Sequence, residues 1–599
     1  MKSILIGFDA FDPLRFEALA ERGELPNLRA FMGQGAYRRF AIPNPAQSEV
    51  SWSSIATGLD PGGHGLFDFV HRDPATYALE VSLLPVKQSL VGTQFVRPHT
   101  ARTFFDHAVE QGYPATSLWW PATFPARLES PIQSIPGLGT PDIHGKLGVG
   151  VLLTADLPAA AGIEKTTLDK LEKTGSLYRG RLPGPLRKNG DQAWLAVELA
   201  AEGQTVALTV GKQRLTLRAG EWTPVLELAF PMGMLGSVRF VTRAIVSLSP
   251  VVQVYFLPLQ LHPFGSPWPY AAPPGFIKQA WKAHGPFLTL GWPQDTTGLD
   301  EGILNDGQFL ALCEDIIATR ERVFMQQLAG FKEGVLAVVF DTLDRVQHMF
   351  WREHPHIIDE WYRKLDALFG RILAAAPKDA RIVVVSDHGF KTYEHKVHLN
   401  GWLAGQGHLF ATNGKRSLDA VDWTRTTAYA VGLNSLYLNL QGREGQGIVP
   451  PTEIDSRRRI LKDALLGWKG PDGRAVVEHV ALREEVITGP LARLGPDLLV
   501  GYAPGYRASS ETGTGKWAAE VIEPNRDHWA ADHCINPAAV PGVVFANHGL
   551  ADLPHPSFKD LPELVLGEAF EPRPGEPPAG LLAEDQRTIE ERLSGLGYL

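Results

Sequence analysis

The sequence predicts an α/β protein with a doubly wound, mostly parallel sheet and an inserted all-β domain. Three observations predict this fold. Nearly continuous apolar runs, typical of strands buried on both faces, lead into acidic residues. Stretches with apolar residues at helical spacing separate these runs, as in a doubly wound sheet. One further region consists of short strand-like runs at close spacing, which is typical of an all-β domain.

The apolar runs are expected to be core strands. They are Ser3–Phe8, Gly334–Phe340, Arg381–Val385 and, near the C-terminus, Gly542–Ala546. The first three lead, in order, into Asp9, into Asp341 and Asp344, and into Asp387 with His388. Ligands gather outside the carboxyl ends of the strands in an open α/β sheet, so these side chains are predicted to converge on one site. A single aspartate at a strand end is more commonly a helix cap, and the prediction therefore depends on the repetition.

Helical spacing and the region of short runs together predict the domain organisation. The expected helices are Leu14–Leu19 with Leu28–Phe31, Phe309–Leu328 and Asp359–Ala375. From about residue 176 to 260, runs such as QTVALTV and QRLTLRAG interrupt the alternation. We therefore expect the first part of the core at 1–155, a mainly β insertion with a lid or connector at 156–300, and the second part of the core at 301–599. The span His262–Pro293, rich in Pro, Gly and aromatic residues, is expected to be an irregular lid or connector.

Composition and charge exclude several classes of protein. The formal net charge of −9 over 599 residues disfavours nucleic acid as a partner. The two cysteines, Cys313 and Cys534, are too few for a disulfide framework and are expected to be inert thiols. The N-terminal apolar run is too short for a signal segment, and no stretch free of charge reaches the length of a membrane span. We therefore expect a cytoplasmic protein, and its oligomeric state stays open.

Ser48 is the candidate nucleophile. It opens the stretch SEVSWSSIATGLDPGGHG, in which Ser51 is a rival. A serine at such a turn is more commonly a helix cap, so the choice depends on acids and histidines elsewhere in the chain. Glu49 is expected to be a solvated acid, with a contact to a metal or a leaving group as the alternative. His64 is expected to pack within its loop.

Carboxylates and imidazoles recur in pairs that suit metal binding. The pairs are Asp344 with His348, Asp387 with His388, and Asp532 with His533. A helix would place Asp344 and His348 on one face, a spacing that two-ligand metal sites use. Asp341 is an alternative to Asp344, but it lacks the four-residue spacing to His348. Mixed carboxylate and imidazole ligands suit zinc, manganese or iron, in contrast to the all-oxygen sites of calcium.

In this order along the chain, the set resembles the alkaline phosphatase superfamily. It is similar in particular to the type I phosphodiesterase/nucleotide pyrophosphatase branch and to related predicted phosphohydrolases and phosphomutases. The matching features are Asp9; Ser48, ten residues before Gly58 of TGLDPGGHG; Asp344 with His348; SDHG at Ser386–Gly389; and His533. The resemblance extends to the C-terminal GLGYL and implies an alkaline phosphatase-like core with a two-metal site. It implies one metal on Asp344, His348 and His533, and the other on Asp9, Asp387, His388 and the Ser48 oxygen.

The resemblance implies a metal-dependent phosphohydrolase that acts through a covalent phosphoserine on Ser48. A metal at the serine oxygen lowers the pKa of the hydroxyl, and a second metal holds a phosphoryl oxygen. The implied cofactors are two divalent ions, zinc or alternatively manganese, and the implied substrate is a small phosphodiester or phosphomonoester. A phosphomutase is the alternative within the superfamily, and a non-catalytic binding protein on a relic core is the alternative outside enzymes. Phe69 stands where the pyrophosphatase branch often has Asn, which is a departure from that pattern.

Overall fold

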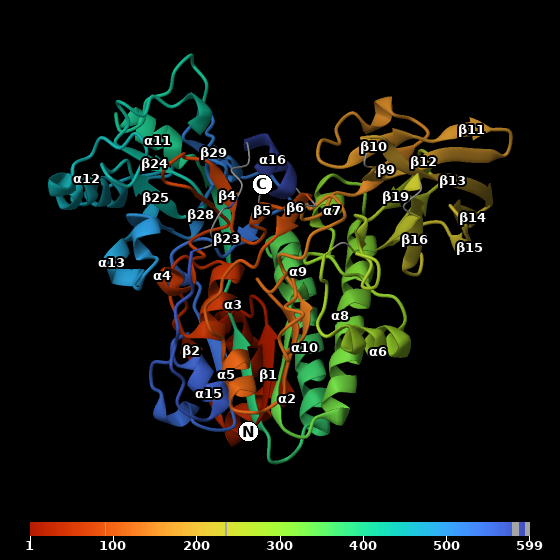
Figure 1. Ribbon diagram of the computed structural model, residues 1–599, viewed down its shortest axis with the longest axis horizontal. Helices are drawn as coiled ribbons and strands as arrows, with labels where there is room; N and C mark the ends of the chain where they lie inside the picture. Colours follow the sequence, from red (N-terminus) through yellow and green to blue (C-terminus); the bar gives the residue numbers. More distant parts are fainter. Residues whose placement is uncertain are drawn as a thin grey trace. The chain divides into compact units, whose positions relative to one another are not determined.

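The chain divides into two units, one of which carries a large mixed α/β sheet (Figure 1). The computed structural model describes residues 1–89, 92–187, 189–233, 236–266, 268–577, 581 and 586–593. The first unit consists mainly of Met1–Thr123 and Phe324–Glu590, and the second mainly of Phe124–Val323. The C-terminal GLGYL, to which the family resemblance extends, lies outside the described residues.

Parallel strands form the centre of the large sheet in the first unit. Within this unit the strand order is β2, β31, β22, β1, β21, β7. The strands are β1 (Lys2–Phe8), β2 (Ala36–Phe40), β7 (Ala115–Trp120), β21 (Gly334–Phe340), β22 (Arg381–Ser386) and β31 (Gly542–Ala546). Strand β1 pairs in parallel with β21 and β22, and β21 with β7, whereas β31 is antiparallel to β22 and β2. The four core strands expected from the apolar runs are confirmed, and every residue of β21 and β31 is buried.

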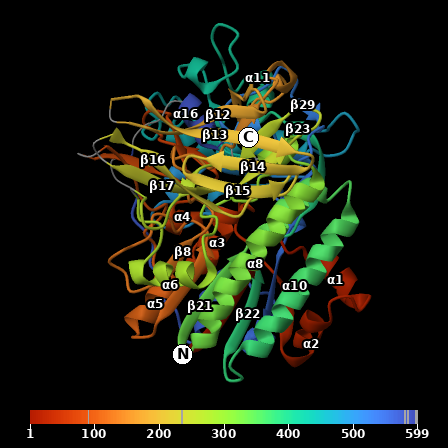
Figure 2. The same cartoon turned by 90° about the vertical axis from the view of Figure 1, so that its right-hand side faces the viewer.

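Helices cover both faces of this sheet, as Figure 2 shows for α3 and α5 on one side and α1, α2 and α10 on the other. Helices α3 (Ser48–Thr57), α5 (Phe104–Glu110) and α15 (Leu561–Leu566) contact one another on the first face. On the second face, α1 (Pro13–Glu21) contacts α2 (Pro26–Gln34), which contacts α10 (Pro355–Ala375). The expected α/β class with a large sheet is confirmed. Among the described residues, no helix combines the length and the apolar character needed to cross a membrane.

Sequence signals account for the limits of the helices that matter for the site. The side chain of Asp12 caps α1 by accepting a hydrogen bond from the Arg15 backbone N–H, and Pro13 occupies the first turn. Helix α3 ends at Gly58, whose φ of 67° is left-handed and therefore favours glycine. Helix α9 (Thr342–Phe350) follows directly on β21. Because of these limits, Ser48 at the start of α3 and the face of α9 with Asp344 and His348 lie at the carboxyl end of the sheet.

The remaining elements of the first unit form two four-stranded sheets, two two-stranded sheets and further helices. One four-stranded sheet has the order β24, β25, β27, β26, and in the other β23 pairs with β28, β29 and β30. The bounds are α4 (Pro61–His64), β3 (Val70–Arg72), β4 (Leu79–Val81), β5 (Val86–Ser89), β6 (Gly92–Phe95), β23 (Lys391–Val397), α11 (Leu399–Gly405), β24 (Ala428–Ala430), β25 (Ser435–Leu438), α12 (Ile454–Leu466), β26 (Val477–Leu482), α13 (Arg483–Val486), β27 (Leu498–Tyr502), β28 (Gly505–Ala508), α14 (Ser510–Gly513), β29 (Ile522–Pro524), β30 (Ala531–Asp532) and α16 (Gln586–Leu593). The pairing of β30 with β23 fixes the position of the residue that follows it, His533.

Short strands dominate the second unit. They are β8 (Gln133–Pro136), β9 (Val151–Thr154), β10 (Thr167–Lys170), β11 (Glu172–Thr174), β12 (Leu177–Leu186), β13 (Gln192–Glu202), β14 (Thr205–Val210), β15 (Gln213–Arg218), β16 (Leu226–Pro231), β17 (Ser237–Thr242), β18 (Ala244–Ser247), β19 (Gln253–Phe256) and β20 (Gln260–Leu261). Strands β11 to β15 form one antiparallel sheet. Strands β9, β12 to β14 and β16 to β19 contribute side chains to a buried apolar cluster that includes Leu199, Leu208 and Phe230. The alternating runs predicted between residues 176 and 260 therefore do form strands.

One expectation for the second unit is wrong. The span His262–Pro293 contains helix α6 (Pro274–His284) and is not irregular throughout. Phe276, Ile277 and Ala280 are buried, and this spacing gives the helix an apolar face. The expectation was based on the content of Pro, Gly and aromatic residues, but a proline in the first turn, such as Pro274, is compatible with a helix. Helices α7 (Thr296–Asp300) and α8 (Asp306–Gly330) follow, and α8 contains the helix expected at Phe309–Leu328.

Candidate active site

The seven predicted site residues meet at the carboxyl end of the central sheet, in the first unit. Asp9 follows β1, Ser48 begins α3, Asp344 and His348 lie in α9, Asp387 and His388 follow β22, and His533 follows β30. All seven side chains are buried. Parallel strands end at the same edge of a sheet, which explains why residues so far apart in sequence lie together.

One group of side chains surrounds the ring of His388. Its Nε2 lies 3.1 Å from Ser48 Oγ, 3.1 Å from Asp387 Oδ2 and 3.8 Å from Asp9 Oδ1. Its Nδ1 lies 3.1 Å from the backbone carbonyl oxygen of Gly389. When Nδ1 carries the proton, it donates to that carbonyl and leaves the Nε2 lone pair facing the three oxygens.

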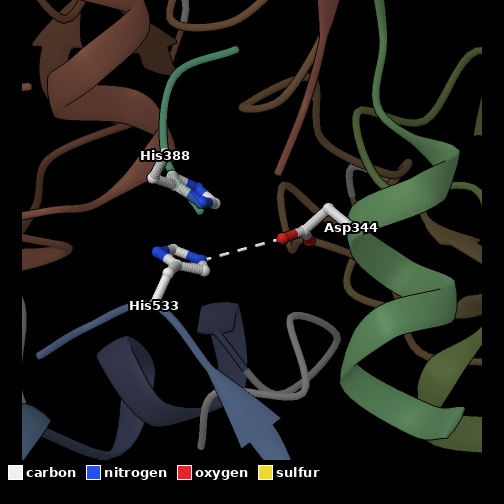
Figure 3. Close-up of side chains that lie close together, drawn as sticks. All are labelled: Asp344, His388 and His533. Carbon is white, nitrogen blue, oxygen red and sulfur yellow. Dashed lines mark ion pairs between the residues drawn. The ribbon is translucent and has the colours of Figure 1, made fainter. Parts of the chain in front are cut away.

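A second group surrounds the carboxylate of Asp344. His348 Nε2 lies 3.3 Å from Asp344 Oδ2, and His533 Nε2 lies 3.8 Å from Asp344 Oδ1. The Nδ1 atoms of both histidines face backbone carbonyl oxygens at 2.7 Å, those of Ala531 and Ala46. The rings of His388 and His533 stack at 3.5 Å between centroids, so the two groups adjoin (Figure 3).

The donor atoms of both groups fit divalent cations. The buried oxygens Asp9 Oδ1, Asp344 Oδ1 and Asp387 Oδ2 accept no hydrogen bond from any residue that the structure describes. In a tetrahedral site with bonds of about 2.0–2.2 Å, neighbouring donor atoms lie roughly 3.3–3.6 Å apart. The distances between donor atoms in the two groups, from 3.1 to 3.8 Å, lie around this value. Carboxylate oxygens and imidazole nitrogens thus converge at spacings that suit a shared cation.

Electrostatics within the site also favour a bound cation. Burial, and next the carboxylate of Asp387, raise the pKa of Asp9 well above its usual value. Burial, followed by the neighbouring ring of His388, lowers the pKa of His533 to about 3. Burial acts to raise the pKa of Asp344, but His348 and Arg345 outweigh it and hold that pKa below its usual value. Buried acids that repel one another and a neutral imidazole are the states that a metal ion stabilises.

Several residues that support the site were not found by sequence reasoning. The Trp52 Nε1–H donates to Asp9 Oδ2 at 3.2 Å. The ring of Trp529 stacks on His348 at 3.6 Å between centroids, and its Nε1–H donates to Asp532 Oδ2 at 2.9 Å. Asp532 is the exception among these, because the sequence pairs it with His533 as residues that suit metal binding. The tryptophans are recognised only from contacts between distant segments.

The structure agrees with the expectation for His64 but not with the expectation for Glu49. His64 packs within its own segment, because its Nδ1 accepts from the Leu66 backbone N–H at 3.2 Å and its Nε2 lies 3.0 Å from Ser54 Oγ. Glu49 was expected to be a solvated acid, and this is wrong, because its exposed fraction is 0%. The reason is that every residue of α3 is buried. Burial raises the pKa of Glu49 well above its usual range, against a hydrogen bond from its own backbone N–H, and Asp68 and Asp387 add to the rise.

Comparison with known proteins identifies a family for most of the chain. The sequence profile of the family described as "Type I phosphodiesterase / nucleotide pyrophosphatase" matches residues 3–529. Among solved structures, the chain is similar to phosphonoacetate hydrolase from Sinorhizobium meliloti 1021 in complex with phosphonoformate, at 14% identity and a TM-score of 0.46, over 94% of this chain and 95% of that one. It is also similar to murine ectonucleotide pyrophosphatase/phosphodiesterase 5, at 10% identity and a TM-score of 0.41, over 96% of this chain and 98% of that one. No curated protein matches the sequence.

Proposed function

Because this chain belongs to the type I phosphodiesterase/nucleotide pyrophosphatase family, and is thus a phosphoric ester hydrolase of the alkaline phosphatase superfamily, we propose that Ser48 is its nucleophile in a two-metal-dependent reaction. One observation carries the proposal. Ser48 Oγ lies 3.1 Å from His388 Nε2, among buried carboxylate oxygens that have no hydrogen-bond donor in the described part of the chain. A serine that served only as a helix cap would not need this surrounding.

The two groups of donors support a proposal for the metal ligands. One divalent ion would be held by Asp344, His348 and His533, and the other by Asp9, Asp387, His388 and the Ser48 oxygen. Mixed nitrogen and oxygen donors suit zinc, with manganese as the alternative. When bound, the two ions supply positive charge at the serine oxygen and at the phosphoryl oxygens of the substrate.

The chain's own residues prepare Ser48 for attack. Ser48 occupies the first position of α3, where free backbone N–H groups and the helix dipole favour negative charge on its oxygen. Trp52, one turn later, holds the carboxylate of Asp9 through its indole N–H. The Nδ1 of His388 faces the Gly389 carbonyl, which fixes the ring with Nε2 toward Ser48. Contacts within the protein therefore hold Ser48 and the proposed ligands Asp9 and His388 in position before a substrate binds.

The proposed reaction has two balanced steps. Ser48 Oγ loses its proton and attacks phosphorus, the Oγ–P bond forms, and the bond to the leaving oxygen breaks; the leaving group takes up a proton. Water then attacks the phosphorus of the phosphoserine, the Oγ–P bond breaks, and Ser48 recovers a proton. Phosphodiesters and phosphomonoesters both fit this sequence of steps.

The second part of the proposal concerns the domain organisation of the chain. We propose that residues 156–300 form an inserted, mainly β domain outside the alkaline phosphatase-like core of residues 1–155 and 301–599. The succession of strands from β10 to β20 supports this division.

The experiment that tests the function compares Ser48→Ala with Ser51→Ala. Both serines are buried in α3, and Ser51 is the rival nucleophile, so it is the matched control. Hydrolysis of bis-p-nitrophenyl phosphate and of p-nitrophenyl phosphate is measured after reconstitution with zinc or with manganese. We expect Ser48→Ala to lower kcat by roughly a thousandfold or more, and Ser51→Ala to retain activity.

Other outcomes would contradict the proposal in distinct ways. Full activity of Ser48→Ala would remove Ser48 as the nucleophile, and loss in Ser51→Ala alone would assign the role to Ser51. If the wild-type protein bound two metals but hydrolysed neither compound, a phosphomutase, which returns the phosphoryl group to a retained substrate, would become the better proposal.

A further inference from the structure

Glu49 is buried beside the candidate nucleophile and has no hydrogen-bond partner on any other residue that the structure describes. It is the second residue of α3, directly after Ser48, and its exposed fraction is 0%. Neither Oε1 nor Oε2 accepts a hydrogen bond from another residue among those that the structure describes. A buried carboxyl in this state costs the protein free energy, so it requires an explanation.

A neighbouring acid shows how this region satisfies a carboxylate that has a purely structural role. Asp68 is also fully buried. It accepts five hydrogen bonds at 2.8–3.0 Å, from the side chains of Gln47 and Ser435 and from the backbone N–H groups of Phe69, Leu433 and Asn434. These donors are therefore already committed to Asp68. The charge of Asp68 raises the pKa of Glu49, but none of the groups that donate hydrogen bonds to Asp68 donates one to Glu49.

The position of Glu49 connects it to the active site. Glu49 directly follows Ser48 at the start of α3, and both side chains are buried. After burial and a hydrogen bond from its own backbone N–H, the acids Asp68 and Asp387 act on the pKa of its carboxyl, and both raise it. The carboxyl of Glu49 therefore lies in the buried region around the proposed nucleophile, and no other residue that the structure describes donates a hydrogen bond to it.

We propose that Glu49 determines substrate specificity by accepting a hydrogen bond from a donor group on the organic part of the phosphate ester. This inference rests on the proposed function, since it concerns the substrate of Ser48. A hydroxyl and an ammonium group both offer the required N–H or O–H close to the phosphorus. Sites that pair a buried polar group with a substrate donor discriminate strongly against analogues that lack the donor, because the protein group then stays unpaired.

Three matched esters test the inference with the wild-type protein alone. The compounds are ethyl, 2-hydroxyethyl and 2-aminoethyl phosphate, or their p-nitrophenyl diesters if the enzyme prefers diesters. We expect kcat/KM for at least one donor-bearing ester to exceed that for the ethyl ester by about 10- to 100-fold. The ratio of the hydroxyl to the amino ester identifies which donor the site prefers.

Glu49→Gln then shows whether Glu49 is the cause. Gln keeps the size and one acceptor oxygen but replaces the second oxygen with an NH₂ donor, so the preference for the donor-bearing ester should fall about tenfold or more, mainly through KM, while the ethyl ester changes little. Glu21→Gln, at an exposed position in α1, is the control and should change none of the three values. Metal content is measured in both variants. An equal loss for all three esters in Glu49→Gln would indicate a structural role and overturn the inference.

Failure of the inference and failure of the proposed function give different results. Equal kcat/KM for all three esters in the wild-type protein would overturn the inference and leave the function standing. Hydrolysis of none of them, nor of the p-nitrophenyl compounds, would overturn the proposed function and the inference with it.

Discussion

At the scale of single residues, Asp532 links two histidines that are assigned to the same metal. Its Oδ1 accepts from the His533 backbone N–H at 2.7 Å, and its Oδ2 accepts from the indole N–H of Trp529, which stacks on His348. Arg507 Nε lies 2.7 Å from Asp532 Oδ2 and balances its charge. One carboxylate thus orients ligands from two distant segments, as partners behind metal ligands commonly do.

We expect Asp532→Asn to weaken the binding of one metal ion and to leave the other nearly unchanged. Asn keeps the size of the side chain but loses the charge next to Arg507 and one of the two acceptor positions. The affinity of the weaker ion should fall about 10- to 100-fold. Titration against a chelating dye, with metal analysis of the dialysed protein, measures this. Asp527→Asn, an acid that pairs with Lys396 at the surface, is the control. Equal affinities in both variants would contradict the prediction.

At the scale of elements, a close approach between β1 and α3 sets the position of Ser48 relative to Asp9. A Cβ atom on Gly7 would lie 2.5 Å from the ring of Trp52 and 3.1 Å from Val339 Cγ2. Trp52 is fully buried and holds Asp9 through its indole N–H. The missing side chain at position 7 therefore lets the helix pack directly on the strand.

We expect Gly7→Ala to lower both stability and activity. The new methyl group must displace Trp52, and with it α3, at a cost of about 1–3 kcal/mol in the free energy of unfolding. Denaturant unfolding and kcat on p-nitrophenyl substrates measure the two effects. Gly33→Ala in α2 is the control, because a Cβ there meets nothing within 4 Å and alanine favours a helix. Wild-type kcat in Gly7→Ala would show that the close packing does not position Ser48.

Elements were predicted from the sequence more fully than the contacts between them. The strands Gly334–Phe340 and Gly542–Ala546 have the expected bounds, because strands buried on both faces are continuous in apolar residues. The rule that ligands gather at strand ends led to Asp9 and Asp387. The burial of Glu49 could not be predicted in this way, because it depends on segments that pack around α3 from elsewhere in the chain. The stacking of Trp529 on His348, a proposed metal ligand, has no local pattern either.

At the scale of the whole molecule, the candidate ligands come from segments between residues 9 and 533, so metal binding should stabilise the native chain. A ligand that binds only the folded state contributes about 2.7 kcal/mol at a concentration 100 times its Kd. We expect chelation to lower Tm by a few degrees and zinc to restore it. Differential scanning calorimetry with and without chelator measures this. Ser48→Ala keeps six of the seven ligands and should show a similar shift. Identical Tm values with and without chelator would contradict the metal assignment.

The strand order also bears on how the chain is made. Strand β2 is translated early, at residues 36–40, but its neighbour in the central sheet is β31, at residues 542–546. At 5–20 residues per second, a ribosome needs roughly 25–100 seconds to reach that partner. During this interval β2 presents an unpaired edge, and His533 has not joined the other ligands. Chaperone protection of the nascent chain, and late loading of the metal whose proposed ligands include His533, follow from this order of synthesis.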